Sequence, residues 1–190
     1  MDDLTIVPAR HKLNVDAYYR MAEAGIFGED DRIELIDGDM MDMAPIGQGH
    51  AAIVNGLNEA LVPACVGRAI VLTQNSIRLD ESSAPQPDLA VLRRRDDFYA
   101  TGERPGPADV LLLIEVSDSS ANFDRTVKLP LYARAGIAEV WIVDLKRRVL
   151  DAFRKPAAGQ YHETTTHQSG EELALTLEPD IVVRLNLIFG

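Results

Sequence analysis

Residues 111–120 read LLLIEVSDSS, an aliphatic run interrupted by a single carboxylate, Glu115. Such a run, preceded by Val110, is typical of a strand that is buried on both faces of a sheet. Burying an unpaired carboxylate is unfavourable, so an acid in a strand that is truly buried indicates a hydrogen-bonded pair or a metal site. The stretch therefore predicts the centre of the fold and a candidate functional residue.

Working outward from this strand, hydrophobic periodicity predicts an α/β chain of the α+β type, in which helices flank a mixed central sheet. The strands at 110–116 and 139–144 are expected at its centre, and the tail from Glu171 is expected to form short strand and turn pieces. Three further helices are expected: one from Asn14, one over 48–61 ending at Pro63, and one within 121–136 that Pro130 makes irregular and Gly136 stops. The other expected strands are a hairpin at about 32–36 and 39–44, one or two strands within 67–80, a strand at 87–94, a strand at 148–155 and an edge strand at 160–167.

Length and composition favour one domain spanning residues 1–190, because 46% of the residues are hydrophobic. The longest apolar run is far too short for a membrane helix and the N-terminus lacks a signal pattern, so we expect a cytoplasmic protein without a membrane partner. Cys65 is the single cysteine, which excludes an intrachain disulfide and predicts a buried, inert thiol. The net charge of −11 argues against broad, non-specific affinity for nucleic acid.

Three local patterns have simple structural interpretations. The basic runs at 93–95 and 146–148 are interpreted as solvated ends of strands in preference to a phosphate-binding patch. The segment 47–52 fits G-x-G-x-x-A, but it follows a hairpin and does not open a βαβ unit, so we interpret it as a turn into a helix. The sequence also lacks the G-x-S-x-G pattern of a nucleophile elbow.

Two acids on successive predicted strands form the strongest chemical pattern. Pro87 marks a strand entry and places Asp88 near an end of the sheet, and Glu115 follows 27 residues later. If their strands are neighbours, the two carboxylates can share one divalent cation. Mg²⁺ suits such a site, since it takes one or two carboxylates together with water and phosphate oxygens.

Lys128 is the candidate for a cation that holds the attacking water and offsets charge on the phosphate. Asp124, Lys128 and Tyr132 recur at every fourth position, so a helix would align them on one face. The alternative is that Asp124 and Lys128 form a weak surface ion pair while Tyr132 packs in the core.

Glu34 and His50 are further candidates with open alternatives. Glu34 lies in an alternating strand, where it is either a solvated residue or an additional ligand for metal or water. His50, at the start of a helix, could approach the same cleft, although a capping or surface role is favoured. No role is assigned to His162 or His167.

The segments RIELIDGDMM (32–41), QPDLAVL (86–92), LLLIEVSDSS and D-x-x-x-K-x-x-x-Y-x-x-x-G-I-x-E-V-W-I-V-D (124–144) resemble the Uma-two family of putative restriction endonucleases, within the PD-(D/E)xK nuclease superfamily. The resemblance spans about residues 14–155 and implies a restriction-endonuclease-like domain. Asp88 and Glu115 match the two acids, and Glu34 matches an acid in the first hairpin. Ser117 stands where the superfamily has its lysine, and Lys128 matches a lysine moved onto the following helix.

The sequence thus predicts a Mg²⁺-dependent endonuclease acting on DNA, with Mn²⁺ as a possible substitute. Asp88 and Glu115 are the expected metal ligands, and Lys128 and Glu34 complete the catalytic set. A homodimer is expected by analogy with nucleases that cut both strands. The alternatives are a non-catalytic interaction protein that retains the nuclease fold and a metal-dependent hydrolase of a non-duplex substrate, both favoured by the net charge of −11.

Overall fold

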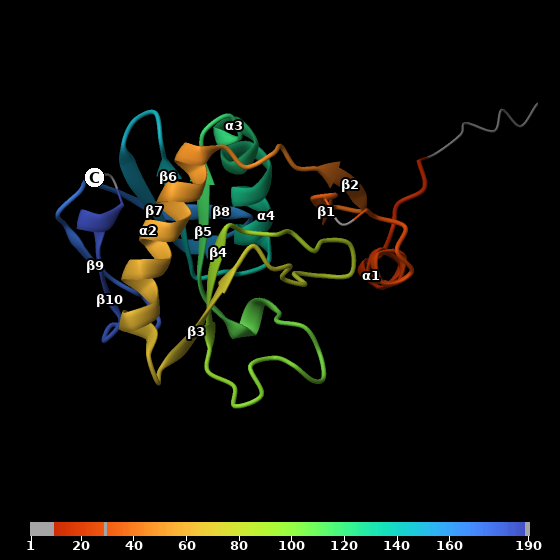
Figure 1. Cartoon of the computed structure of the whole chain (residues 1–190), viewed down its shortest axis with the longest axis horizontal. Helices are drawn as coiled ribbons and strands as arrows, with labels where there is room; N and C mark the ends of the chain where they lie inside the picture. Colours follow the sequence, from red (N-terminus) through yellow and green to blue (C-terminus); the bar gives the residue numbers. More distant parts are fainter. Residues whose placement is uncertain (1–9, 29, 189–190) are drawn as a thin grey trace, which may run out of the picture.

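A six-stranded mixed sheet forms the centre of the computed structural model, which describes residues 10–28 and 30–188. The strand order is β3-β4-β5-β6-β7-β8, so the strands predicted at 110–116 and 139–144 are indeed the two central ones (Figure 1). Neighbouring strands are antiparallel except for β5 and β6. The strands are β3 (Ala69–Thr73), β4 (Leu89–Arg93), β5 (Val110–Ser117), β6 (Glu139–Asp144), β7 (Val149–Ala157) and β8 (Gln160–His167).

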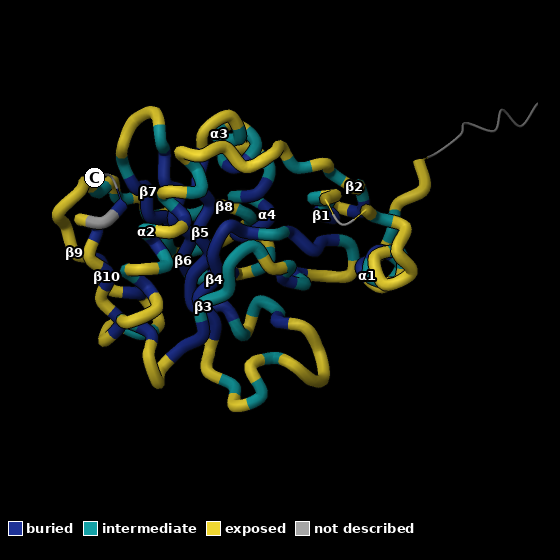
Figure 2. Tube along the Cα trace, in the orientation of Figure 1, coloured by how far each residue is buried: buried dark blue, intermediate teal, exposed yellow. Residues whose placement is uncertain are grey.

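The parallel pair β5–β6 is buried along its whole length, as a continuous aliphatic run predicts (Figure 2). Two parallel strands need a crossover, and residues 118–138 provide it. The crossover contains α3 (Ala121–Phe123), the π-helical turn η2 (Asp124–Lys128) and α4 (Leu129–Arg134). Gly136, with φ +78°, follows α4 in the left-handed conformation typical of a helix stop.

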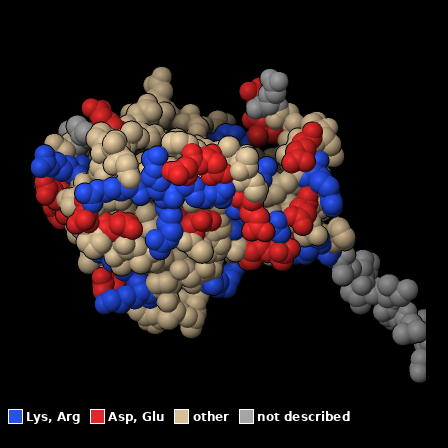
Figure 3. Space-filling model, turned by 90° about the horizontal axis from the view of Figure 1, so that it is seen from below, with Lys and Arg blue, Asp and Glu red and all other residues tan. Residues whose placement is uncertain are grey.

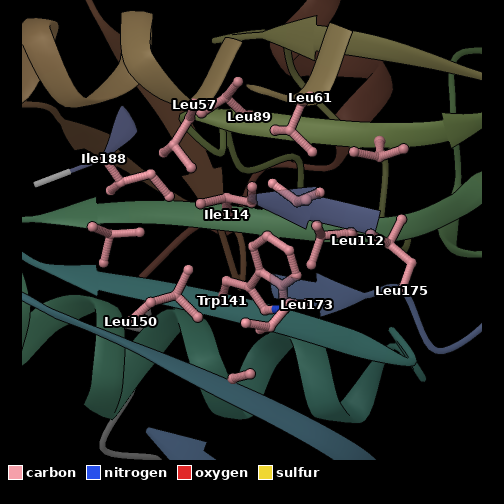
Figure 4. Packing of buried hydrophobic residues seen from close by; sticks show 14 of the residues in the cluster. Leu57, Leu61, Leu89, Leu112, Ile114, Trp141, Leu150, Leu173, Leu175 and Ile188 are labelled. Carbon is pink, nitrogen blue, oxygen red and sulfur yellow. The ribbon is translucent and has the colours of Figure 1, made fainter. Parts of the chain in front are cut away.

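Helices cover both faces of the sheet. On one face α2 (Gln48–Cys65) packs with a small C-terminal sheet of β9 (Glu172–Ala174) and β10 (Val182–Arg184), followed by η3 (Leu185–Leu187). Figure 4 shows Leu57 and Leu61 of α2, Trp141 of the sheet and Leu173 in this core. On the other face, Leu131 and Tyr132 of α4 pack on Leu113, Val140 and Ile142. The short helix η1 (Pro107–Asp109) precedes β5.

The N-terminal elements have the predicted form. Helix α1 (Val15–Glu23) begins after Asn14, whose side chain accepts a hydrogen bond from the Ala17 amide at 2.8 Å. Strands β1 (Ile33–Ile36) and β2 (Asp39–Asp42) pair around Asp37-Gly38, and both turn residues have positive φ. Leu35 also bridges to Ala84, which attaches the hairpin to the segment before β4.

One detail differs from the sequence-based expectations, and two others become more specific in the structure. Helix α2 does not stop before Pro63 but continues to Cys65. Proline in the last turn removes one hydrogen bond, but the burial of Leu61 and Cys65 outweighs that loss. The run 67–80, in which one or two strands were expected, contains one strand, β3. The irregularity predicted near Pro130 is a π-helical turn over Asp124–Lys128.

Two further expectations can be compared with the structure. Cys65 is buried as predicted, and burial raises the pKa of its thiol to about 11. In residues 10–28 and 30–188, no helix has the length and apolar character needed to span a membrane.

Candidate active site

A cavity of about 180 Å³ lies at one end of the sheet, where β5 ends, Asp88 leads into β4, and α2 begins. This is the upper end of the sheet in Figure 1. The titratable side chains that line the cavity come from separate parts of the chain: Arg32, His50, Asp88, Glu115, Asp118 and Asp124.

Asp88 and Glu115 lie on neighbouring strands, as their proposed partnership requires. Strands β4 and β5 are antiparallel with Leu89 opposite Ile114, so Asp88, one residue earlier, faces Glu115. The Asp88 Oδ2 accepts hydrogen bonds from the Val116 amide at 2.9 Å and from His50 Nε2 at 3.0 Å. Burial acts to raise the pKa of Asp88, but these bonds outweigh it and the pKa is lowered. Asp88 is therefore an ionised carboxylate.

Glu115 is held from the opposite side by α4 and the turn before it. Lys128 Nζ lies 3.3 Å from Oε1 and 3.4 Å from Oε2, and the Tyr132 hydroxyl donates a hydrogen bond to Oε1. The Glu115 residue is only 3% exposed. Burial raises its pKa well above the usual carboxyl value, and the positive charge of Lys128 only partly offsets the effect.

Lys128 is fully buried between two carboxylates. Its Nζ lies 3.0 Å from Glu34 Oε2, in addition to its contacts with Glu115. Burial acts to lower the pKa of Lys128, but the charges of Glu115 and Glu34 outweigh it and raise the pKa above its usual value. The alternative of a surface pair with Asp124 is wrong, because both residues are buried. Lys128 therefore keeps its positive charge, and that charge lies next to Glu115.

Glu34 on β1 is fully buried, so the solvated alternative is wrong for this residue as well. Its Oε2 accepts hydrogen bonds from Lys128 and from the Gln86 amide at 3.0 Å. The bridge between Leu35 and Ala84 holds β1 against the segment that leads to Asp88. The N-terminal hairpin therefore delivers its acid to the same cluster.

Asp124 is a residue of the cavity that the sequence did not single out as functional. Its Oδ2 accepts hydrogen bonds from the hydroxyls of Ser117 at 2.6 Å and Ser120 at 2.7 Å. Ser117 thus orients an acid on the next turn. The four-residue spacing from Asp124 to Lys128 was the available signal, but it is shared by ordinary surface ion pairs.

The cluster carries more negative than positive formal charge. Four buried acids, Glu34, Asp88, Glu115 and Asp124, surround Lys128, the one lysine that is buried among the described residues. The other buried acids have arginine partners: Glu139 pairs with Arg154, and Asp144 and Asp151 pair with Arg125 and Arg147.

Carboxylate oxygens are the ligands that Mg²⁺ and Mn²⁺ prefer, so the donor set of Asp88 and Glu115 fits such a cation. In the described part of the chain, no three His, Cys, Asp or Glu side chains are arranged together as metal ligands. A cation at this site would therefore use the two carboxylates together with water or phosphate oxygens, the usual coordination of Mg²⁺.

In the basic run at 146–148, Lys146 pairs with Asp118, which lines the cavity. The basic run at 93–95 lies apart from the cavity and is largely neutralised. Arg94 pairs with Asp96 and lies over Phe98, while Arg95 pairs with Asp97. They follow β4 in the loop at the opposite end of the sheet (Figure 1). Viewed from that side, Figure 3 shows basic and acidic side chains intermixed. These arginines fit the predicted solvated strand end better than a phosphate-binding patch.

Comparison with known proteins places this geometry in context. The model of the Uma2 family, described as "Putative restriction endonuclease", matches residues 15–186. The chain is also similar to the crystal structure of a putative nuclease belonging to DUF820 from Anabaena variabilis, with a TM-score of 0.65 and 14% sequence identity over 93% of this chain and 97% of that chain. No curated protein matches the chain. At this identity the structural similarity confirms the fold: a mixed central sheet with flanking helices.

Proposed function

The chain belongs to the Uma2 family of putative restriction endonucleases, and we propose that it is an endonuclease that hydrolyses phosphodiester bonds in DNA with the help of a divalent cation. One observation carries the proposal. Glu34, Asp88, Glu115 and Lys128, far apart in sequence, form one buried cluster whose negative charge exceeds its positive charge, and two of its acids line a cavity. A buried excess of carboxylates is unfavourable unless a cation binds there.

Asp88 and Glu115 would hold the cation, with Mg²⁺ as the expected ion and Mn²⁺ as a substitute. When bound, the cation would polarise the phosphoryl oxygens and make a water molecule more acidic. Asp88 contributes an ionised carboxylate at the cavity. Glu115 contributes a carboxylate whose pKa is raised by burial, so a cation would favour its charged form.

Lys128 would supply positive charge beside the reacting phosphate and help to hold the attacking water. Because its pKa is raised, it acts as a hydrogen-bond donor and not as a base. Its side chain is 1% exposed and contacts both Glu34 and Glu115, so one of these contacts would open when Lys128 reaches water. Glu34 positions Lys128 from the side away from Glu115.

A homodimer and a DNA substrate are parts of this proposal that need separate tests. A second active site in the same particle would allow both strands of a duplex to be cut, and light scattering would measure the oligomeric state. The net charge of −11 favours a second candidate, hydrolysis of a nucleic acid other than long duplex DNA.

Cleavage of supercoiled plasmid and of single-stranded DNA, with Mg²⁺ and with EDTA, tests the proposal. We expect Mg²⁺-dependent cleavage that is lost in Glu115→Gln and Lys128→Ala. Glu139→Gln is the matched control, because it removes another buried carboxylate, on the adjacent strand β6, outside the lining of the cavity. Equal cleavage by all four proteins would refute the site. Failure of the wild type to bind Mg²⁺ or Mn²⁺ in calorimetry would favour the non-catalytic alternative.

A further inference from the structure

His50 contacts Asp88 from the opposite wall of the cavity. It is the third residue of α2, and its side chain is 17% exposed. Its Nε2 lies 3.0 Å from Asp88 Oδ2, and both residues line the cavity. The predicted surface or capping role for His50 does not describe this contact, which links the start of α2 to the start of β4.

The two oxygens of Asp88 have unequal partners. The Oδ2 accepts hydrogen bonds from His50 and from the Val116 amide, and its lone pairs are occupied. The Oδ1 has one long contact, from Gln74 Nε2 at 3.4 Å. Such a contact is beyond the usual range for a strong hydrogen bond, so Oδ1 is the oxygen with free acceptor capacity.

We propose that His50 is a positioning residue for Asp88: together with the Val116 amide it fixes Oδ2 and orients Oδ1 toward the cation. This inference rests on the proposed function, because it assigns His50 to the same cation site. Hydrogen bonds to a ligating carboxylate set its orientation, and their loss typically lowers metal affinity by about 10–100-fold.

The proposal defines the tautomer of His50. An ionised carboxylate only accepts hydrogen bonds, so the ring must carry its proton on Nε2. In the neutral ring, Nδ1 is then a bare acceptor. Two buried side-chain polar atoms among the described residues have no partner, His50 Nδ1 and Glu34 Oε1, and both belong to the candidate site. Unsatisfied buried groups are rare in proteins and are often associated with function.

His167 offers a matched control. Its Nδ1 lies 2.7 Å from Glu171 Oε2, so it forms a histidine–carboxylate contact of the same kind on β8, outside the lining of the cavity. Replacing His167 tests the general effect of losing such a contact. His50→Gln is the conservative variant, because the amide N–H₂ of glutamine can reach the place of the imidazole Nε2–H.

Calorimetric titration with Mn²⁺ and Mg²⁺ compares the full-length wild type with His50→Ala, His50→Gln and His167→Ala, after thermal unfolding has shown that each is folded. We expect His50→Ala to lose about 10–100-fold in cation affinity, His50→Gln to recover most of it, and His167→Ala to bind as the wild type does. Long-range ¹H–¹⁵N NMR of the wild type should show a protonated Nε2 for His50.

The outcomes separate this inference from the proposed function. Wild-type binding with an unaffected His50→Ala variant would overturn the inference and leave the cation site intact. Weak binding by both His50 variants would also overturn it, because the donated hydrogen bond would then not be the important feature. An Nε2 that carries no proton would do the same. Absence of cation binding in the wild type would overturn the proposed function and this inference with it.

Discussion

Glu115 and Glu139 are buried acids on the two central strands, yet their surroundings differ. Glu139 accepts hydrogen bonds from Trp141 Nε1 at 2.7 Å, from Arg154 at 2.7–2.9 Å and from the Thr176 amide at 2.7 Å. Both of its oxygens have strong donors, and it lies outside the lining of the cavity. Glu115 shares its lysine with Glu34 and does line the cavity.

The difference distinguishes a structural acid from a candidate functional one. Glu139 and Arg154 form an ion pair. Glu139 also accepts a hydrogen bond from the Thr176 amide, which holds the segment after β9 on the face covered by α2. Glu115 belongs to a cluster of four acids and one lysine, where burial disfavours its charged form. Natural proteins tolerate such local instability mainly where function requires it.

Removing each carboxylate should therefore affect stability very differently. We expect Glu139→Gln to lower the free energy of unfolding by about 3–5 kcal/mol, because it breaks the ion pair between a fully buried carboxylate and Arg154, whose side chain is only 18% exposed. Glu115→Gln should cost much less, or stabilise the protein, since it removes a charge that burial disfavours. Urea unfolding at pH 7 measures both values. An equal loss in the two variants would mean that Glu115 is a structural acid like Glu139.

Mg²⁺ should stabilise the folded chain through the site at Glu115 and not through Glu139. At a concentration 100 times the dissociation constant, a ligand of the native state adds about 2.7 kcal/mol. We expect this gain in the wild type and in Glu139→Gln, measured by unfolding in Mg²⁺ against EDTA. Asp88→Asn should abolish it. A gain that persists in Asp88→Asn would place the cation elsewhere.

The fold was largely predictable because its strongest signals are local. The aliphatic run of β5, the Asp37-Gly38 turn and the Gly136 stop each depend on a few adjacent residues. The continuation of α2 through Pro63 was not predictable, since it depends on the burial of Leu61 and Cys65 in a core that also involves other elements. Local propensity favours a helix end there, and tertiary packing overrides it.

The proximity of Asp88 and Glu115 in the candidate site was predictable, because their order along the chain matched a known pattern. The burial of Glu34 was left open, because it depends on the bridge between β1 and Ala84, nearly fifty residues away in sequence. The contact of His50 with Asp88 likewise depends on how α2 packs on the sheet. Asp124 was missed because its partners, Ser117 and Ser120, are common turn residues.

The pH dependence of stability should show the raised pKa of Glu115. In the unfolded chain a glutamate titrates near its ordinary value of 4.5, but in the folded chain burial keeps the proton on Glu115 to higher pH. The stabilisation that protonated Glu115 gives the folded chain is thus fully present below about pH 4.5. It is lost as the pH rises toward the folded pKa, and the free energy of unfolding falls by up to about 1.4 kcal/mol per pH unit.

Subtracting the Glu115→Gln unfolding energy from that of the wild type at each pH isolates this contribution. We expect the difference to decline from pH 4.5 upward. A difference that rises over the same range would show that Lys128 and Tyr132 lower the pKa of Glu115 more than burial raises it, and Glu115 would then resemble a closed ion pair.

The smallest effect should come from the aromatic donor to Glu115. Burial raises the pKa of Tyr132, so its hydroxyl keeps the proton that it donates to Oε1. Tyr132→Phe should lower the free energy of unfolding by about 1 kcal/mol.

The control is Tyr161→Phe, because the Tyr161 hydroxyl donates to the Ile137 carbonyl at 2.7 Å outside the lining of the cavity, and its loss should cost a similar amount. Only Tyr132→Phe should also weaken Mg²⁺ binding in calorimetry, by about tenfold, because it frees Glu115 to move. If the two variants bind Mg²⁺ equally well, the hydroxyl of Tyr132 serves packing alone, and Lys128 suffices to hold Glu115 in place.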